Sequence, residues 1–123
     1  MNENPFIQPR ETETISYNMP ESVPYELAED IRYYDEPKAT IQGYATRFND
    51  YVDKKTGMPA STEVLYLIID SRLYMTSTKS FIKKFKALVT LRPETAITIN
   101  LIVKQSTDDN GNVFHYPGFV ITV

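Results

Sequence analysis

The chain has 123 residues, 41% of them hydrophobic, a formal net charge of −3 and no cysteine. Those values suit one domain with a modest core, and they exclude disulfides and thiolate sites, which favours a reducing compartment. No apolar run approaches the roughly 20 residues that span a bilayer, and the N-terminus has no basic-then-apolar signal pattern. We therefore expect a cytoplasmic protein without a membrane partner.

Residues 1–37 differ in character from the rest of the chain. They hold nine acidic residues against two arginines, a balance of −7, and five of the eight prolines. This composition indicates an extended or poorly packed arm, within which 21–34 is expected to form a short docking helix that begins near Pro24. The arm is either a solubilising tail or a contact segment, for another protein or for a groove on the same chain.

The body of the protein is expected to begin at residue 38 and carries a balance of +4. Its first part is rich in β-branched and aromatic residues, and Gly43 indicates a bend or bulge there. Asp70-Ser71 indicates a tight turn after a run that is apolar on both faces. The expected elements are, in chain order, a strand over 39–52, a loop over 53–63, a central strand over 64–69 and a short strand over 72–75.

An amphipathic helix is expected next, because apolar residues recur at helical spacing. Ser77 or Thr78 can cap its start, and Pro93 ends it. Asn110-Gly111 indicates a type I′ hairpin turn, and Pro117-Gly118 places the last strand at an edge or at a bulge. The apolar stripe of the helix consists of Phe81, Ile82, Phe85, Leu88 and Val89, and the two strands that follow are expected over 96–105 and 113–123.

The predicted order of these elements is β-β-β-α-β-β. It is the order of an OB-fold, a partly open Greek-key barrel of five strands, with one helix between the third and fourth strands that closes one end. We therefore predict a mainly β, OB-fold-like body over residues 38–123. An α+β sandwich, with the helix lying across an antiparallel sheet, uses the same elements and is the alternative.

Catalysis has little support in the sequence. The only histidine is His115, and no phosphate-binding loop, Rossmann or HExxH pattern is present. Residues 108–112 resemble the start of a calcium loop, but Phe119 stands where the closing acidic residue is required, so a hairpin turn explains them better. We expect neither an enzyme nor a bound metal or cofactor.

Aromatic and basic residues suggest a binding role instead. The chain has nine tyrosines, and because a buried phenol needs a hydrogen-bond partner, several are expected at the surface. Rings interleaved with cations are typical of proteins that bind single-stranded nucleic acid without reading its sequence. The alternative is that the rings pack the barrel and its ends. The candidate binding residues are Tyr44, Phe48, Tyr51, Tyr66 and Tyr74, together with Arg47, Lys54, Lys55, Arg72 and Lys104.

Four short motifs carry a resemblance through their order and spacing. They are Asp70-Ser71-Arg72-Leu73-Tyr74, Thr78-Lys79-Ser80, Gln105-Ser106-Thr107 and Gly111-Asn112-Val113-Phe114. Together they resemble the single-stranded-DNA-binding proteins of small tailed phages that start replication by protein priming. The similarity covers residues 64–123, is weak over 38–63 and is absent over 1–37. It implies an abundant replication protein that coats and protects displaced strands in the host cytoplasm, and it ranks Tyr74 first among the binding tyrosines.

Two classes of function follow from these observations. The leading hypothesis is a sequence-independent single-stranded-DNA-binding protein of phage replication, in which residues 1–37 serve self-association or recruit a replication partner. The alternative is a protein-binding module, such as a phage inhibitor or assembly factor, that docks through its acidic arm. A virion or scaffold component is the third possibility.

Overall fold

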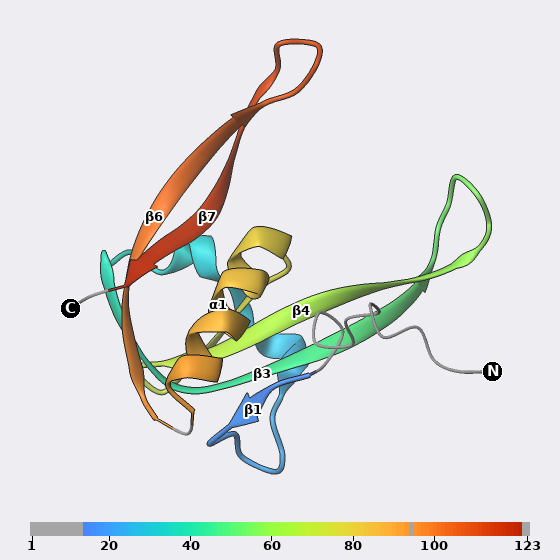
Figure 1. Cartoon of the computed structure of the whole chain (residues 1–123). Helices are drawn as coiled ribbons and strands as arrows, with labels where there is room; N and C mark the ends of the chain where they lie inside the picture. The colour runs from blue at the N-terminus through green and yellow to red at the C-terminus, as the bar shows by residue number, and fades with distance from the viewer. Residues whose placement is uncertain (1–13, 94, 122–123) are drawn as a thin grey trace, which may run out of the picture.

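The computed structural model describes residues 14–93 and 95–121. The protein is mainly β, with one α-helix packed in the hollow of a curled, open sheet (Figure 1). The elements are β1 (Ser16–Tyr17), η2 (Tyr25–Leu27), β2 (Glu29–Asp30), η3 (Ile31–Tyr33), β3 (Lys38–Val52), β4 (Pro59–Ile69), β5 (Arg72–Thr76), α1 (Lys79–Leu91), β6 (Ile97–Thr107) and β7 (Val113–Ile121), where η marks a 3₁₀ turn. The strands form one sheet in the order β2-β5-β4-β3-β6-β7, and β1 pairs with β3.

Strand β3 organises this sheet because two different partners share one of its edges. Residues 38–41 pair with β6, whereas β1 pairs with Tyr44 and Ala45. The predicted bulge lies between Ile41 and Gly43. A Cβ on Gly43 would lie 2.7 Å from the backbone oxygen of Asn18, so glycine is required for this close approach. Beyond the bulge the β3–β4 and β6–β7 hairpins diverge, as Figure 1 shows.

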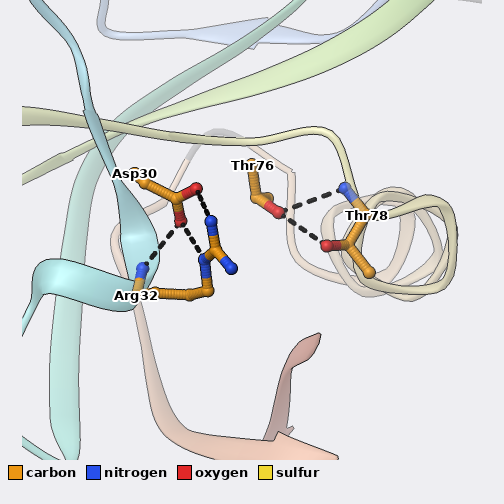
Figure 2. Close-up of polar contacts among 4 residues, drawn as sticks. All are labelled: Asp30, Arg32, Thr76 and Thr78. Atoms are coloured by element: carbon orange, nitrogen blue, oxygen red, sulfur yellow. Dashed lines mark hydrogen bonds and ion pairs between the residues drawn. The ribbon is translucent and has the colours of Figure 1, made fainter. Parts of the chain in front are cut away.

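The core lies between the concave face of the sheet and α1. The predicted apolar stripe of the helix is buried, and the ring of Phe85 lies 5.1 Å from the ring of Tyr44 and 6.2 Å from that of Phe119. Burying one such large apolar side chain stabilises the fold by about 1.5–3 kcal/mol. The helix begins after Thr78, whose backbone N–H donates to the Thr76 hydroxyl oxygen at 3.1 Å (Figure 2).

Residues 14–37 are packed on the body, which corrects the expectation of a poorly packed arm and of a boundary at residue 38. They add β1 and β2 to the five predicted strands, giving seven. Ile31 is 2% exposed and belongs to the core. The Tyr34 hydroxyl donates to the backbone oxygen of Lys38 at 2.9 Å. The earlier residues 1–13 lie outside the described part of the chain.

The helix expected over 21–34 is wrong, because two 3₁₀ turns flank the short strand β2 there instead. Ala28 is extended, with φ −64° and ψ 136°, and ends the first turn. Asp30 caps the second turn by accepting the Arg32 backbone N–H at 2.9 Å, and it pairs with the Arg32 guanidinium (Figure 2). Burial raises the pKa of Asp30, but the hydrogen bonds and charge of Arg32 outweigh it and hold that pKa below its usual value.

The two hairpin loops also differ from expectation. Strand β4 begins at Pro59, so the loop after β3 covers 53–58 rather than 53–63. The last hairpin is not a type I′ turn, because Gly111 has a positive φ of 83° and Asn110 does not. Its geometry is set by the Asp108 carboxylate, which accepts the backbone N–H groups of Asn110 and Asn112 at 2.9 Å. The tight turn at Asp70-Ser71 is confirmed, with φ values of 52° and 64°.

Candidate nucleic-acid interface

Seven of the ten predicted binding residues lie on the β3–β4 hairpin, and five of the seven are exposed. Phe48 and Tyr51 are 40% and 50% exposed, although both are aromatic. The basic members of this group are Arg47 on β3 and Lys54 and Lys55 in the loop, and all three are exposed. The loop is held by its own hydrogen bonds, since the Asp53 carboxylate accepts the Lys55 backbone N–H at 2.8 Å. The hairpin therefore presents two rings and three cations to solvent.

A groove separates this hairpin from α1. It encloses about 1250 Å³, and Phe48 and Tyr51 line one wall. The opposite wall is the face of α1 that carries Lys79, Lys83 and Lys86. The remaining lining residues are Ile15, Ser61, Thr62, Glu63, Ser77, Ile82, Ala87, Thr90 and Leu91. Proteins that bind single-stranded nucleic acid use aromatic rings to stack bases and cationic groups to contact phosphates. This groove has rings on one wall and ammonium groups on the other.

One of the three lysines in the groove forms an ion pair with an acidic residue on β4. Lys86 Nζ lies 2.5 Å from Glu63 Oε2, and the two side chains are 12% and 16% exposed. This pair ties α1 to the hairpin and contributes no net charge to the groove. Lys79 and Lys83 line the same helical wall, and Lys54 and Lys55 lie in the loop at the tip of the hairpin.

Lys84 lies on the other side of the helix, toward the second hairpin. Its ammonium group donates to the backbone oxygen of Phe119 at 2.5 Å and lies 4.8 Å from the centre of the Phe119 ring. Lys84 therefore holds α1 against β7 and does not line the groove. The four lysines of the helix divide between the groove and this structural contact.

Three of the predicted stacking tyrosines lie in the interior, which corrects their assignment. Tyr44 is 3% exposed, and Tyr66 and Tyr74 are each 5% exposed. Their partners are other aromatic rings: Phe85 beside Tyr44, Tyr34 at 5.4 Å from Tyr74, and Tyr25 at 4.5 Å from Tyr66. In this conformation a base cannot reach these three rings. The physical reason is that residues 17–34 return to cover them, and the sequence pattern does not reveal this return.

Arg72 and Lys104 are exposed but do not line the groove. Arg72 follows the Asp70-Ser71 turn and borders a second, smaller hollow. Lys104 lies on the β6–β7 hairpin, where its methylene groups would be 3.0–3.1 Å from a Cβ built on Gly118. Of the predicted residues, Phe48 and Tyr51 line the groove. Lys54 and Lys55 lie in the loop of the same hairpin, and the guanidinium of Arg47 lies over the Tyr25 ring.

The lysines of α1 are site residues that the sequence analysis missed, although their spacing contains a signal. Lys79, Lys83 and Lys86 are separated by four and then three residues, which places them on one helical face. By itself such a stripe is typical of the solvated back of a core helix. Only the position of the β3–β4 hairpin beside it turns that face into the wall of a groove.

The chemistry outside the groove is limited. No group of three or more histidine, aspartate or glutamate side chains that could hold a metal ion occurs within residues 14–93 and 95–121. Within the same residues, α1 is too short and too polar to cross a membrane. Comparisons with protein-family models, with curated proteins and with solved structures found no match to this chain.

Proposed function

We propose that this protein binds single-stranded DNA without sequence preference, in the groove between α1 and the β3–β4 hairpin. The observation that carries the proposal is the half-exposed pair Phe48 and Tyr51 facing the lysine-bearing side of α1. Bases would stack on the two rings, and each stacked base contributes about 1–3 kcal/mol. The bases of a duplex already stack on one another, so this mode requires an unpaired strand.

Phosphates would contact Lys79 and Lys83 along the helix and Lys54 and Lys55 at the tip. These contacts are ionic and do not read base edges, so they position the strand without selecting a sequence. Each phosphate contact releases condensed counterions, and the affinity then falls as salt increases. The groove therefore combines a sequence-tolerant stacking surface with a salt-dependent one.

We also propose that the curled sheet is an OB-like barrel that stays open. In support, the five strands of the body follow the order β5-β4-β3-β6-β7. The two long hairpins then occupy the places of the loops between strands one and two and between strands four and five. In OB-folds those loops flank the bound oligonucleotide. The role in phage replication, in the host cytoplasm, rests on the resemblance over residues 64–123.

The alternative, a protein-binding module that docks through its acidic arm, has less support. Most of that arm is already engaged with the body: the ring of Tyr17 lies 5.5 Å from that of Tyr44, and Ile31 is part of the core. Docking would therefore have to use residues 1–13 or detach residues that the fold uses. The two functions differ in a simple measurement, because only the first predicts binding of oligo-dT.

The test is a titration of the purified full chain with oligo-dT at several salt concentrations, followed by tyrosine fluorescence. A double variant, Lys79→Gln/Lys83→Gln, should flatten the plot of log affinity against log salt by about 1.4, because each phosphate that is no longer neutralised lowers the slope by roughly 0.7. A matched variant, Lys38→Gln/Lys104→Gln, removes the same charge from outside the groove and should change the slope little. No quenching and no gel shift at low salt, or an equal loss in both variants, would disprove the proposal.

A further inference from the structure

The outer face of the sheet, opposite the groove, carries an aromatic arrangement that the packing of a core does not require. The ring of Tyr25 lies 4.5 Å from the ring of Tyr66 at an interplanar angle of 63°. The guanidinium carbon of Arg47 lies over the same Tyr25 ring, 4.3 Å from its centre. Tyr25 is therefore contacted by an aromatic ring and by a guanidinium group at once.

An aromatic ring and a guanidinium group are also the partners that hold an unpaired nucleobase, although Tyr25 itself meets Tyr66 edge-on. Bases are flat π systems, and they stack on aromatic rings and on the planes of arginine side chains. The segment around Tyr25, which we call the strap and define as residues 20–28, also carries exposed carboxylates at Glu21 and Glu26. Tyr25 therefore resembles a nucleotide in having a flat π system and in having negative charges close to it.

The strap is held to the sheet by few interactions. In the described chain its backbone hydrogen bonds are local, from Tyr25 to Val23, from Leu27 to Pro24 and from Ala28 to Tyr25. Leu27 is 72% exposed. A hollow of about 460 Å³ remains between the strap and the turn that joins β4 to β5. The strap can consequently leave without breaking the pairing of the long strands.

We propose that Tyr66 and Arg47 form a second base-stacking subsite, which the strap closes by placing Tyr25 where a nucleobase would bind. The inference rests on the proposed function, because the displacing ligand is the same single-stranded DNA. Arg47 and Phe48 are consecutive on β3 and so lie on opposite faces of the hairpin. Strand β1 and Ile15 cover this edge of β3 at residues 44–46, and a polynucleotide can pass around the edge beyond them.

Because Tyr25 competes with the base, its contacts reduce the apparent affinity of the subsite. The ring pair corresponds to a factor of about two to twelve and the cation–π contact to a factor of about two to five, so their removal should tighten binding roughly 4- to 60-fold. Tyr25→Ala in the full chain should therefore bind oligo-dT more tightly than the natural sequence. The matched control is Tyr33→Ala, which removes a 74% exposed ring from η3, just outside the strap.

A third variant assigns the gain to the subsite. Tyr25→Ala/Tyr66→Ala should lose the gain, because the ring that the base would stack on is gone. Circular dichroism checks that each variant is folded. A folded Tyr25→Ala protein that binds no more tightly than the natural sequence, or a gain that survives the removal of Tyr66, would overturn the inference.

A measurement on the natural sequence avoids any effect of the substitutions on folding. Cleavage by a glutamate-specific protease at Glu21 and Glu26 should become faster when saturating oligo-dT displaces the strap, and unchanged or slower cleavage contradicts the inference. If Lys79→Gln/Lys83→Gln weakens binding but the strap does not respond, only this inference fails. If oligo-dT binds neither the natural sequence nor Tyr25→Ala, the proposed function fails with it.

Discussion

The β3–β4 hairpin ends in Lys54 and Lys55, whereas the β6–β7 hairpin ends in Asp108 and Asp109. Both hairpins extend from the same body (Figure 1). Both carry aromatic rings at or near the surface: Phe48 and Tyr51 are exposed on the first, and on the second Phe114 is exposed and Tyr116 is partly buried. The two hairpins differ in how they face α1. The first faces the lysines of α1 across a groove, and the second is held to α1 by Lys84.

An exposed ring is expected to bind a nucleic acid only where the charges around it attract phosphate. The backbone N–H groups of Asn112 and Asn110 donate to the Asp108 carboxylate and lower its pKa, which favours its negative form. A negative tip repels phosphate, whatever rings stand beside it. If the proposed function holds, DNA should contact the first hairpin and the second should not affect its binding.

The largest effect is expected from the rings. Phe48→Ala and Tyr51→Ala should each weaken binding of a labelled oligo-dT by about 1–3 kcal/mol, roughly 5- to 150-fold, because each removes a stacked base. The matched pair Phe114→Ala and Tyr116→Ala should leave the affinity within about twofold, since neither ring lines the groove. Fluorescence anisotropy measures both. Equal losses from the two hairpins would end the assignment.

The next largest difference is expected in stability, between alanine substitutions of the glycines near the bases of the two hairpins. Gly43→Ala should cost about 1–3 kcal/mol of unfolding free energy, because the new Cβ meets the backbone of Asn18. Gly118→Ala should cost about 0.5 kcal/mol or less, because it meets the methylene groups of Lys104, which can move. Urea denaturation of the two variants checks this, and a larger loss at Gly118 would refute it.

The charges at the tips should give a smaller difference. Lys54→Gln/Lys55→Gln should flatten the salt dependence of oligo-dT binding by about 1.4 and weaken the affinity at low salt. Asp108→Asn/Asp109→Asn should change the affinity less and in the opposite direction, because it removes a repulsion distant from the groove. The measurement is a titration at several salt concentrations. If the slope of log affinity against log salt changes in Asp108→Asn/Asp109→Asn but not in Lys54→Gln/Lys55→Gln, the expected difference between the hairpins is wrong.

The smallest effect concerns the carboxylate of Asp30, beside the strap. Its pKa is lowered in the folded state, so the stability that it contributes is present above its unfolded pKa of about 3.9 and is lost as the pH falls through the folded value. Asp30→Asn should lower the unfolding free energy by about 0.2–1 kcal/mol at pH 7. Urea midpoints at pH 7 and pH 3 should show the difference between the two proteins shrinking in acid.

Much of the body could be predicted from the sequence, because its elements depend on local patterns. The apolar stripe from Phe81 to Val89 predicts the helix, and the Asp70-Ser71 turn and the bulge at Gly43 follow from turn and glycine preferences. The prediction of β4 is too short because Ser61 and Thr62 are typical of loops. Pairing with Asp50 and Asn49 across the hairpin makes them part of the strand.

The site was less predictable, since it depends on contacts between distant parts of the chain. Nothing local to Tyr66 or Tyr74 indicates that Tyr25 and Tyr34 lie against them. The same long-range packing makes 14–37 part of the fold, although its prolines and acids resemble those of a disordered segment. Residues whose exposure depends on one hairpin alone, such as Phe48 and Lys54, are placed correctly at the surface.

The short pairing between β3 and β6, which we call the seam, can act as a hinge between the two hairpins. The two strands pair at four positions, from Lys38 to Ile41, while β3 continues for a further 11 residues to Val52. At about 3.3 Å per residue this extension of β3 is roughly 36 Å long. A rotation of about 5° at the seam would therefore move the tip by about 3 Å. Small movements near the core would therefore produce a larger change in the distance between the tips of the two hairpins. Polymers of different thickness would be accommodated without a change in strand pairing.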